Sequence, residues 1–248
     1  MLSLLVVTAH PDDEAANFGG TVSVYASQGV ECRLLCLTAG EAARNRGNAR
    51  DGEELKRLRR QELAASCELL GFAGHEVWDL PDAHLPEASF FPTVVRMIGL
   101  IRGFRPELVL SLGPEGSATG HPDHAMAGVL ATAAFHWAGQ ERYITQPALP
   151  PYQARRLFYG TVAHQPPGFP PVMLPEPQIE MEVAPYLERK IAAFRCHATQ
   201  SPLFARVEVF LRLAGGRELF HLAAGVPLPE GATDLFAGLP ADCSSTPA

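Results

Sequence analysis

The sequence predicts an α/β fold, a doubly wound and mostly parallel sheet with helices on both faces and a small β extension at the C-terminus. Two observations support this prediction. Short apolar runs alternate with segments of helical character along most of the chain. Several of these runs end abruptly in polar loops that contain glycine, proline, histidine and acids. In an open parallel sheet, such loops lie beyond the carboxyl ends of the strands, where ligands bind.

The composition is that of a folded globular protein. The chain has 248 residues, of which 47% are hydrophobic and 19% charged, and this length suits one domain better than two. The net charge of −7 and the absence of a clustered basic face argue against a nucleic-acid partner. We expect no nucleic acid among the partners.

The cysteines and the N-terminal run predict the cellular location. Five cysteines form neither a C-x-x-C pair nor a close framework, which suits a reduced protein. The first apolar run has no basic region before it and meets His10 and Pro11 too early for a signal peptide or a membrane span. We therefore expect a cytoplasmic protein without a membrane partner, in which Cys32 and Cys36 are buried.

Sequence patterns in the first two thirds of the chain predict five strands and four helices. Apolar runs predict strands at residues 2–7, 32–37, 77–80, 107–112 and 156–162. Helical patterns, some with glycine at the end or proline near the start, lie at residues 14–28, 53–70, 92–103 and 125–138. Strand, helix, strand order implies right-handed crossovers between parallel neighbours. The loop 38–52 is longer than a typical connection, which indicates a substrate loop or lid.

The last third of the sequence predicts less regular structure than the alternating strands and helices before it. Residues 165–177 are proline-rich and predict an extended loop that wraps the site or an edge. A strand is expected at 179–183 and a helix at 185–197. Two apolar runs, 207–213 and 218–222, surround A-G-G-R and predict a terminal hairpin. Residues 240–248 are small and polar, and we expect them to fray.

Two His-Pro-Asp sequences stand directly beyond predicted parallel strands. They read H-P-D-D from His10 and H-P-D-H from His121. In each, the first and last residues are three apart, so both side chains lie on one side of a first helical turn. A catalytic zinc ion takes three nitrogen or oxygen ligands and leaves one position open for water. His10, Asp13 and His124 supply that set, and the two loops can meet at the same edge of the sheet.

The residues left over suit catalysis. Asp12 is free to take a proton from the attacking water. His121, as an imidazolium, would stabilise the oxyanion or protonate the leaving amine, and spacing alone leaves open whether Asp12 or His121 gives that proton. Asp123 would orient His121 from behind. Glu14 would begin the helix, where an acid complements the helix dipole.

Two other classes of protein compete with a metal-dependent enzyme. A nucleotide-binding domain needs a glycine-rich turn after its first strand, and the acids found here would repel a pyrophosphate. A metal-binding protein without catalysis would close its site with a fourth ligand and is usually cysteine-rich. The spare Asp12 and His121 therefore favour an enzyme.

The motifs resemble those of the PIG-L or LmbE-like deacetylases. The family signatures A-H-P-D-D-E and H-P-D-H stand intact at residues 9–14 and 121–124. A third stretch, K-I-A-A-F-R-C-H-A-T-Q from Lys190, resembles the family pattern K-x-x-A-x-x-x-H-x-S-Q, with Thr199 in place of serine. The resemblance implies a Rossmann-like fold in one domain over residues 1–248, with a core at 1–200 and a variable segment at 201–248.

The resemblance also implies an activity and a set of roles. The activity is zinc-dependent removal of an acetyl group from a small N-acetylglucosamine conjugate, either a thiol-precursor glycoside or a short chitooligosaccharide. By this resemblance the metal ligands are His10, Asp13 and His124, the general base is Asp12, and the oxyanion stabiliser or acid is His121. The residues where family members place sugar contacts are Arg59 and Asp82, and Glu41 is a further candidate.

One position departs from the family pattern. Some members that deacetylate thiol-precursor sugars have a tyrosine two residues before the second motif, where it assists catalysis, and Thr119 stands there. Its hydroxyl donates a hydrogen bond over a shorter reach, so the departure concerns the substrate more than the reaction. Residues 165–177 form either a pocket wall or the assembly surface of a homo-oligomer.

Overall fold

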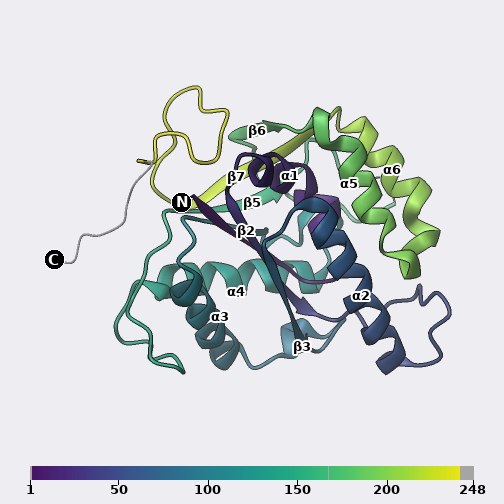
Figure 1. Cartoon of the computed structure of the whole chain (residues 1–248), viewed down its shortest axis with the longest axis horizontal. Coiled ribbons are helices and arrows are strands. Elements are labelled where there is room, and N and C mark those ends of the chain that lie inside the picture. The colour runs from purple at the N-terminus through teal and green to yellow at the C-terminus, as the bar shows by residue number, and fades with distance from the viewer. Residues whose placement is uncertain (1, 167, 241–248) are drawn as a thin grey trace.

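A seven-stranded sheet forms the centre of the computed structural model, which describes residues 2–166 and 168–240 (Figure 1). Its strands are β1 (Ser3–Thr8), β2 (Glu31–Thr38), β3 (Gly74–Leu80), β4 (Leu108–Leu112), β5 (Arg156–Thr161), β6 (Ile179–Glu182) and β7 (Arg217–Gly225). The order across the sheet is β3-β2-β1-β4-β5-β7-β6. Neighbours from β3 to β5 are parallel, whereas β7 is antiparallel to β5 and β6. The predicted α/β fold with a mostly parallel sheet is confirmed.

The likeness to a Rossmann sheet is loose. The order of the first five strands is that of a Rossmann sheet, but the antiparallel pair β7 and β6 stands where a sixth parallel strand would lie. Strand β7 is therefore an inner strand of the sheet, because it pairs with a neighbour on each side.

Helices cover both faces of the sheet, as predicted (Figure 1). They are α1 (Gly19–Ser27), α2 (Gly52–Leu70), α3 (Phe90–Phe104), α4 (Pro122–Ala138), α5 (Leu187–Arg195) and α6 (Phe204–Leu213). Helices α3 and α4 pack together on one face, α1, α2 and α5 on the other, and α6 packs against α5. A π-helical turn spans Glu14–Phe18, and 3-10 turns span Leu85–Glu87, Ser117–Thr119, Ala184–Tyr186 and Ala198–Leu203.

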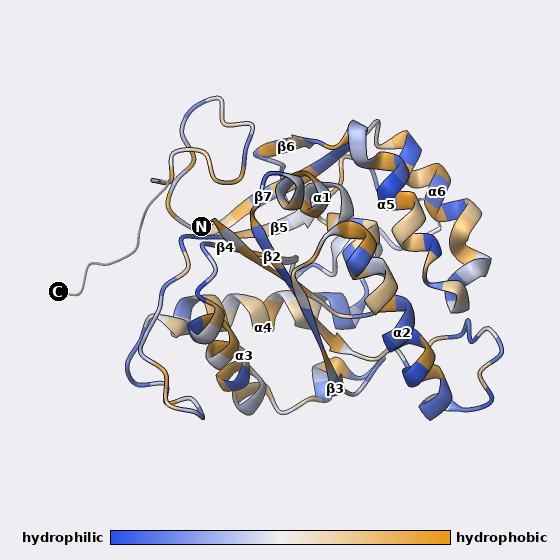
Figure 2. Cartoon of the chain, in the orientation of Figure 1, coloured by the Kyte–Doolittle hydropathy of each residue, from blue (hydrophilic) through white to orange (hydrophobic). Residues whose placement is uncertain are grey.

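Burial explains why the central strands are apolar. Every residue of β1, β4 and β5 is buried, because helices cover both faces of these strands. Figure 2 shows this hydrophobic centre beside the mostly hydrophilic α2. Asp51 caps the N-terminus of α2, since its side chain accepts a hydrogen bond from the backbone N–H of Glu54. Gly71 caps the C-terminus with a left-handed φ of 91°.

The predicted terminal hairpin is wrong, because residues 207–213 belong to helix α6. The alternation in V-E-V-F-L-R-L resembles a strand, but Phe204, Val207 and Leu211 recur at helical spacing and face the protein interior. Val209 and Leu213 are 58% and 80% exposed on the opposite side. Of the two predicted hairpin strands only the second exists, as part of β7.

The segment after residue 200 is part of the core structure. The Arg156 side chain on β5 is fully buried and donates hydrogen bonds to four carbonyl groups of this segment, those of Val226, Pro227, Leu235 and Ala237. The part of the predicted fray at 241–248 lies outside the described residues. No helix in the described part of the chain has the length and apolar character needed to cross a membrane. Cys32 and Cys36 are free and buried, as predicted.

Candidate active site

The first His-Pro-Asp loop begins where β1 ends, and its Asp13 carboxylate is held by the backbone. It accepts hydrogen bonds from the N–H groups of Ala9, at 3.2 Å, and His10, at 2.9 Å. Its other oxygen lies 3.2 Å from Nε2 of His124, in the second loop. Burial opposes ionisation of Asp13, but the imidazoles of His124 and His10 outweigh it and lower the pKa of Asp13. The structure therefore joins the two predicted loops through this carboxylate.

His10 lies between Asp13 and two further carboxylates. Its Nδ1 is 3.7 Å from Asp13, and its Nε2 is 3.1 Å from both Asp82 and Asp123. Burial lowers the pKa of His10, but hydrogen bonds to Asp123 and Asp82 and the charge of Asp13 raise it to about 10. These carboxylates favour a positive charge at this point, whether on the imidazole or on a bound cation.

The second loop brings two more imidazoles to the same place. Helix α4 begins at Pro122, so His121 is its N-cap and His124 stands in its first turn. The ring centroids of His10, His121 and His124 lie 5.0 to 5.2 Å from one another.

Two groups of side chains in the described residues have the spacing of metal ligands. One is His10, Asp13 and His124, and the other is His10, His121 and Asp123; within each group the ligand atoms lie within 4.8 Å of one another. The first group fits a catalytic zinc ion better, because all three of its residues line the cavity, whereas Asp123 does not. In it, the second nitrogen of His10 donates to a carboxylate, as metal-bound histidines commonly do.

Asp123 has a different partner from the predicted one. Its carboxylate is fully buried, lies 3.1 Å from His10 Nε2, and accepts hydrogen bonds from the N–H groups of Ala83 and Leu85. It orients His10, whereas the sequence had suggested His121. The difference arises because α4 starts at Pro122 and directs the Asp123 side chain toward the loop after β3.

His121 is held in one protonation state by its own helix. Its Nδ1 accepts a hydrogen bond of 3.1 Å from the backbone N–H of Asp123 and therefore carries no proton. Burial and the nearby His124 and His10 lower the pKa of His121. Both features favour a neutral imidazole with an N–H at Nε2 over the imidazolium expected from the sequence.

Asp12 is the spare carboxylate of the first loop. It is half-buried and adopts a φ of 114°, which residues other than glycine rarely adopt. Its Oδ2 accepts a hydrogen bond of 3.0 Å from the guanidinium of Arg59. Burial raises the pKa of Asp12 to about 6, while Arg59 opposes this rise. A carboxyl group with this pKa can accept and return a proton near neutral pH.

The three predicted sugar contacts have protein partners. Arg59 is buried and donates to the carbonyl groups of Pro11 and Gly40 as well as to Asp12. Asp82 accepts a hydrogen bond of 2.7 Å from the N–H of Ala42 and lies beside His10. Both still line the pocket. Glu41 is not among the lining residues, and its carboxylate accepts a hydrogen bond of 3.4 Å from the N–H of Asp82.

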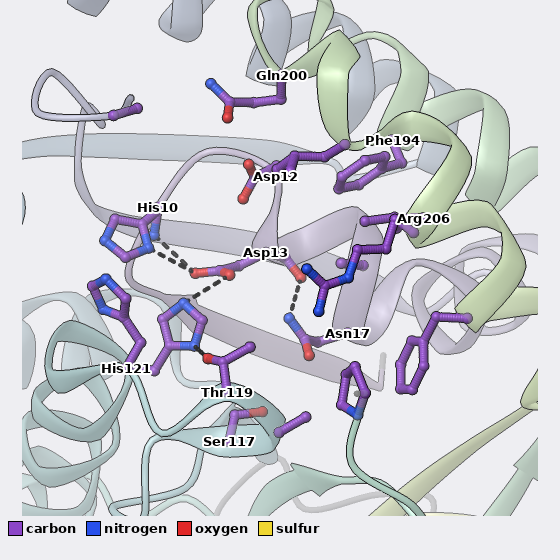
Figure 3. Close-up of a pocket in the computed structure, with 18 of the residues that line it drawn as sticks. His10, Asp12, Asp13, Asn17, Ser117, Thr119, His121, Phe194, Gln200 and Arg206 are labelled. Atoms are coloured by element: carbon purple, nitrogen blue, oxygen red, sulfur yellow. Dashed lines mark hydrogen bonds and ion pairs between the residues drawn. The ribbon is translucent and has the colours of Figure 1, made fainter. Parts of the chain in front are cut away.

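A cavity of about 780 Å³ opens above these side chains. Its lining includes the polar side chains of His10, Asp12, Asp13 and His121 (Figure 3). His124 lines it as well. Seven larger apolar side chains from residues beyond 160, here called the apolar wall, also line it: Pro166, Phe169, Phe194, Leu203, Val207, Phe210 and Leu211. Of the two readings of the proline-rich loop, the pocket wall is therefore confirmed for Pro166 and Phe169.

Sequence reasoning missed several residues of this pocket. Asn17 donates a hydrogen bond of 3.0 Å to the carbonyl of Asp13, and Gln200 and Arg206 also line the cavity. Gln200 lies in the third motif, which was a usable signal. Arg206 was hidden because the end of its helix was read as a strand. Thr119 lies 3.5 Å from Nδ1 of His124, so its hydroxyl is next to the cluster.

The fold and the site define a class of protein, an α/β protein with a pocket of histidine and aspartate side chains at the carboxyl edge of a mixed sheet. A family model described as PIG-L: GlcNAc-PI de-N-acetylase matches residues 5–135, which include both His-Pro-Asp loops. Since this match covers more than half of the chain, the chain belongs to the PIG-L family.

Known relatives and structures agree with this family. The chain is 30% identical to the 1D-myo-inositol 2-acetamido-2-deoxy-alpha-D-glucopyranoside deacetylase of Acidothermus cellulolyticus, over 96% of this chain and 95% of the relative. It is 32% identical to the diacetylchitobiose deacetylase of Thermococcus kodakarensis, over 80% and 70%. The crystal structure of GalB, the 4-carboxy-2-hydroxymuconate hydratase of Pseudomonas putida, matches with a TM-score of 0.76 and 25% identity, over 94% and 100%. The same fold therefore also occurs in a hydratase.

Proposed function

We propose that this chain is a zinc-dependent deacetylase that cleaves the N-acetyl group of a small N-acetylglucosamine conjugate. The observation that carries the proposal is the convergence of the two His-Pro-Asp loops. The ligand atoms of His10, Asp13 and His124 lie within 4.8 Å of one another, and Asp12 and His121 line the same cavity. This arrangement leaves a base and a hydrogen-bond donor beside an open metal position.

The side chains divide the reaction between them. A zinc ion at His10, Asp13 and His124 would supply Lewis acidity and lower the pKa of water. Asp12 accepts the proton of the water that attacks the acetyl carbonyl, because its pKa of about 6 leaves it ionised at neutral pH. His121 donates its Nε2 proton in a hydrogen bond to the oxyanion that forms.

The protonation of His121 suggests which residue protonates the leaving amine. A neutral imidazole whose Nδ1 accepts a backbone hydrogen bond has only one proton, and losing that proton would leave an anionic ring. Asp12 has just taken a proton from water. We therefore assign to Asp12 both proton transfers, from the attacking water and then to the amine nitrogen, and to His121 the oxyanion alone.

The named activities of two relatives support the substrate class. One acts on an acetamido-glucopyranoside of inositol and the other on diacetylchitobiose. We propose that the substrate here is likewise a thiol-precursor glycoside or a short chitooligosaccharide. The apolar wall made by residues beyond 160 would contact the group attached to the sugar, since the reacting side chains come from the two His-Pro-Asp loops instead.

An amine-release assay tests this proposal. Purified protein is incubated with N-acetylglucosaminyl inositol, diacetylchitobiose and N-acetylglucosamine, and the freed amine is measured with an amine-reactive fluorophore. We expect release from at least one conjugate, loss of release with a chelator, and recovery when zinc is added back. Because the hydratase GalB shares the fold, the amine itself must be measured. Absence of amine from every conjugate in the zinc-loaded protein would contradict the proposal.

Location and assembly are further proposals. We propose a cytoplasmic protein, supported by four free cysteines in the described part of the chain. We propose one domain, because β7 pairs within the same sheet as β1 to β5.

We also propose a homo-oligomer, supported by the exposed apolar side chains Val209 and Leu213 of α6. Sedimentation equilibrium of the purified protein would test the oligomer, and a monomer mass would contradict it.

A further inference from the structure

The histidine of the third sequence motif does not line the pocket, yet it reaches the first motif. The His197 side chain is fully buried, and its Nε2 lies 2.7 Å from Oε1 of Glu14, 183 positions earlier in the chain. Glu14 is the last residue of A-H-P-D-D-E and is also fully buried. Neither residue is among those that line the pocket. The contact therefore lies behind the reacting side chains.

The Glu14 carboxylate joins His197 to the backbone of Asp12. Its Oε1 accepts hydrogen bonds from Ser66 Oγ, at 2.6 Å, and from His197 Nε2, at 2.7 Å. Its Oε2 accepts a hydrogen bond of 2.9 Å from the backbone N–H of Asp12. Two donors to Oε1 thus fix the carboxylate whose Oε2 holds the Asp12 peptide.

The Asp12 peptide needs such support because of its conformation. A φ of 114° brings the side chain of an L-residue into a sparsely populated region, which persists only where the surroundings enforce it. Arg59 holds the Asp12 side chain, at 3.0 Å, and Glu14 holds its N–H. Rotation of this residue would turn its carboxylate away from the cavity.

The surroundings of His197 indicate that the ring serves Glu14 in particular. Its Nδ1 is buried and has no hydrogen-bond partner among the described residues, so the contact to Glu14 is the only hydrogen bond of the ring in that part of the chain. Leaving a polar atom buried without a partner is costly. An apolar side chain of similar size would avoid that cost, which makes the contact to Glu14 the reason for a histidine here.

We propose that His197 is a positioning residue for the general base. It orients Glu14, and Glu14 holds the Asp12 peptide in the conformation that directs the Asp12 carboxylate into the cavity. This inference rests on the proposed function, in which Asp12 is the base. It gives His197 a role, that of fixing the first motif while contributing no ligand and no substrate contact.

A second buried ion pair in the same region provides a matched control. Lys190, at the start of the third motif, lies 2.5 Å from Glu218, and both are buried. Glu218 accepts hydrogen bonds from the N–H groups of Gly20 and Thr21 in α1. This pair joins α5, β7 and α1 without touching any residue of the cluster. Its loss should affect stability alone.

The experiment compares three variants with the wild-type protein. In His197→Met the hydrogen bond to Glu14 is lost, in His197→Gln the amide nitrogen takes the place of Nε2, and in Lys190→Met the control pair is broken. For each variant kcat, KM, zinc affinity by chelator competition and the melting temperature are measured, and a metal-free crystal structure gives φ of Asp12.

We expect His197→Met to lower kcat by about 100-fold, as misplacement of a reacting group by about 1 Å does, with KM and zinc affinity unchanged. In its crystal structure Asp12 should leave the left-handed region. His197→Gln should recover most of kcat. Lys190→Met should melt earlier and keep its kcat. If His197→Met does not fold, Ser66→Ala removes the other donor to Glu14 and should lower kcat with KM unchanged.

Other results would overturn the inference. It fails if His197→Met keeps full kcat, if its Asp12 keeps a φ near that of the wild type, or if Lys190→Met loses kcat as strongly as His197→Met. It also fails if His197→Gln is no better than His197→Met. If the wild-type protein deacetylates no conjugate, the proposed function fails, and φ of Asp12 in the His197→Met crystal still decides whether His197 positions that residue.

Discussion

Replacing Asp12 by asparagine is the sharpest test of the general base. Asparagine has nearly the same shape and keeps an oxygen that can accept the 3.0 Å hydrogen bond from Arg59. It also keeps the backbone N–H that Glu14 holds, and it leaves His10, Asp13 and His124 in place. A positioned general base contributes about 10²- to 10⁴-fold to a rate, so we expect kcat to fall by that factor, or about 3 to 5 kcal/mol.

The assay measures kcat by amine release at saturating substrate, and zinc content by elemental analysis of the same preparation. We expect full zinc content together with the loss of kcat. Asp79→Asn, which alters a carboxylate that is 66% exposed and lies outside the cavity, is the matched control and should behave as wild type. Wild-type kcat in the zinc-loaded Asp12→Asn variant would refute the assignment. Loss of zinc along with activity would instead place Asp12 among the ligands.

Three other experiments test the pKa of the base, the support of His10 and the apolar wall. The kcat/KM of the wild-type protein should fall as the pH drops through about 6, because burial raises the pKa of Asp12 to about 6 and a base acts only when deprotonated. Arg59→Met removes the cation that opposes this rise in pKa. The fall of kcat/KM on the acidic side should therefore occur at a higher pH in this variant. Asp82→Ala, which removes a carboxylate 3.1 Å from His10, should weaken zinc binding by about 10- to 100-fold in a chelator competition. Phe210→Ala on the apolar wall should raise KM for a conjugated sugar and leave kcat nearly unchanged in the amine assay.

Each of these predictions has a contrary result. If kcat/KM of Arg59→Met falls at the same pH as that of the wild type, the fall does not arise from protonation of Asp12. Unchanged zinc affinity in Asp82→Ala would show that Asp123 alone orients His10. A fall in kcat without a change in KM in Phe210→Ala would show that the apolar wall acts on the reaction rather than on binding.

The sequence predicted the parallel part of the fold because its signals are local. Strands such as β1 and β4 are buried on both faces and therefore read as uninterrupted apolar runs. The C-terminal part was predicted less well. Helix α6 carries Val209 and Leu213 on its exposed side, so its pattern imitates a strand. The partners of β7 are distant in the sequence, and no local pattern shows that it pairs with β5 and β6.

The spacing of the motifs predicted which residues meet but not how they pair. His10, Asp13 and His124 lie together as expected. The partner of Asp123 depends on where α4 begins, and the burial of Arg59 depends on carbonyl groups of two other loops. The contact between Glu14 and His197 joins two motifs that are far apart in the chain. Such relations follow from packing, which spacing along the chain does not encode.

A zinc-soaked crystal measures the arrangement from which the catalytic roles follow. We expect one ion bound by one nitrogen each of His10 and His124 at about 2.0 to 2.1 Å and by an Asp13 oxygen at about 2.0 to 2.2 Å, with the remaining position facing the cavity. An ion held by His121 and Asp123 in place of Asp13 and His124, or no ion at this edge of the sheet, would contradict the account.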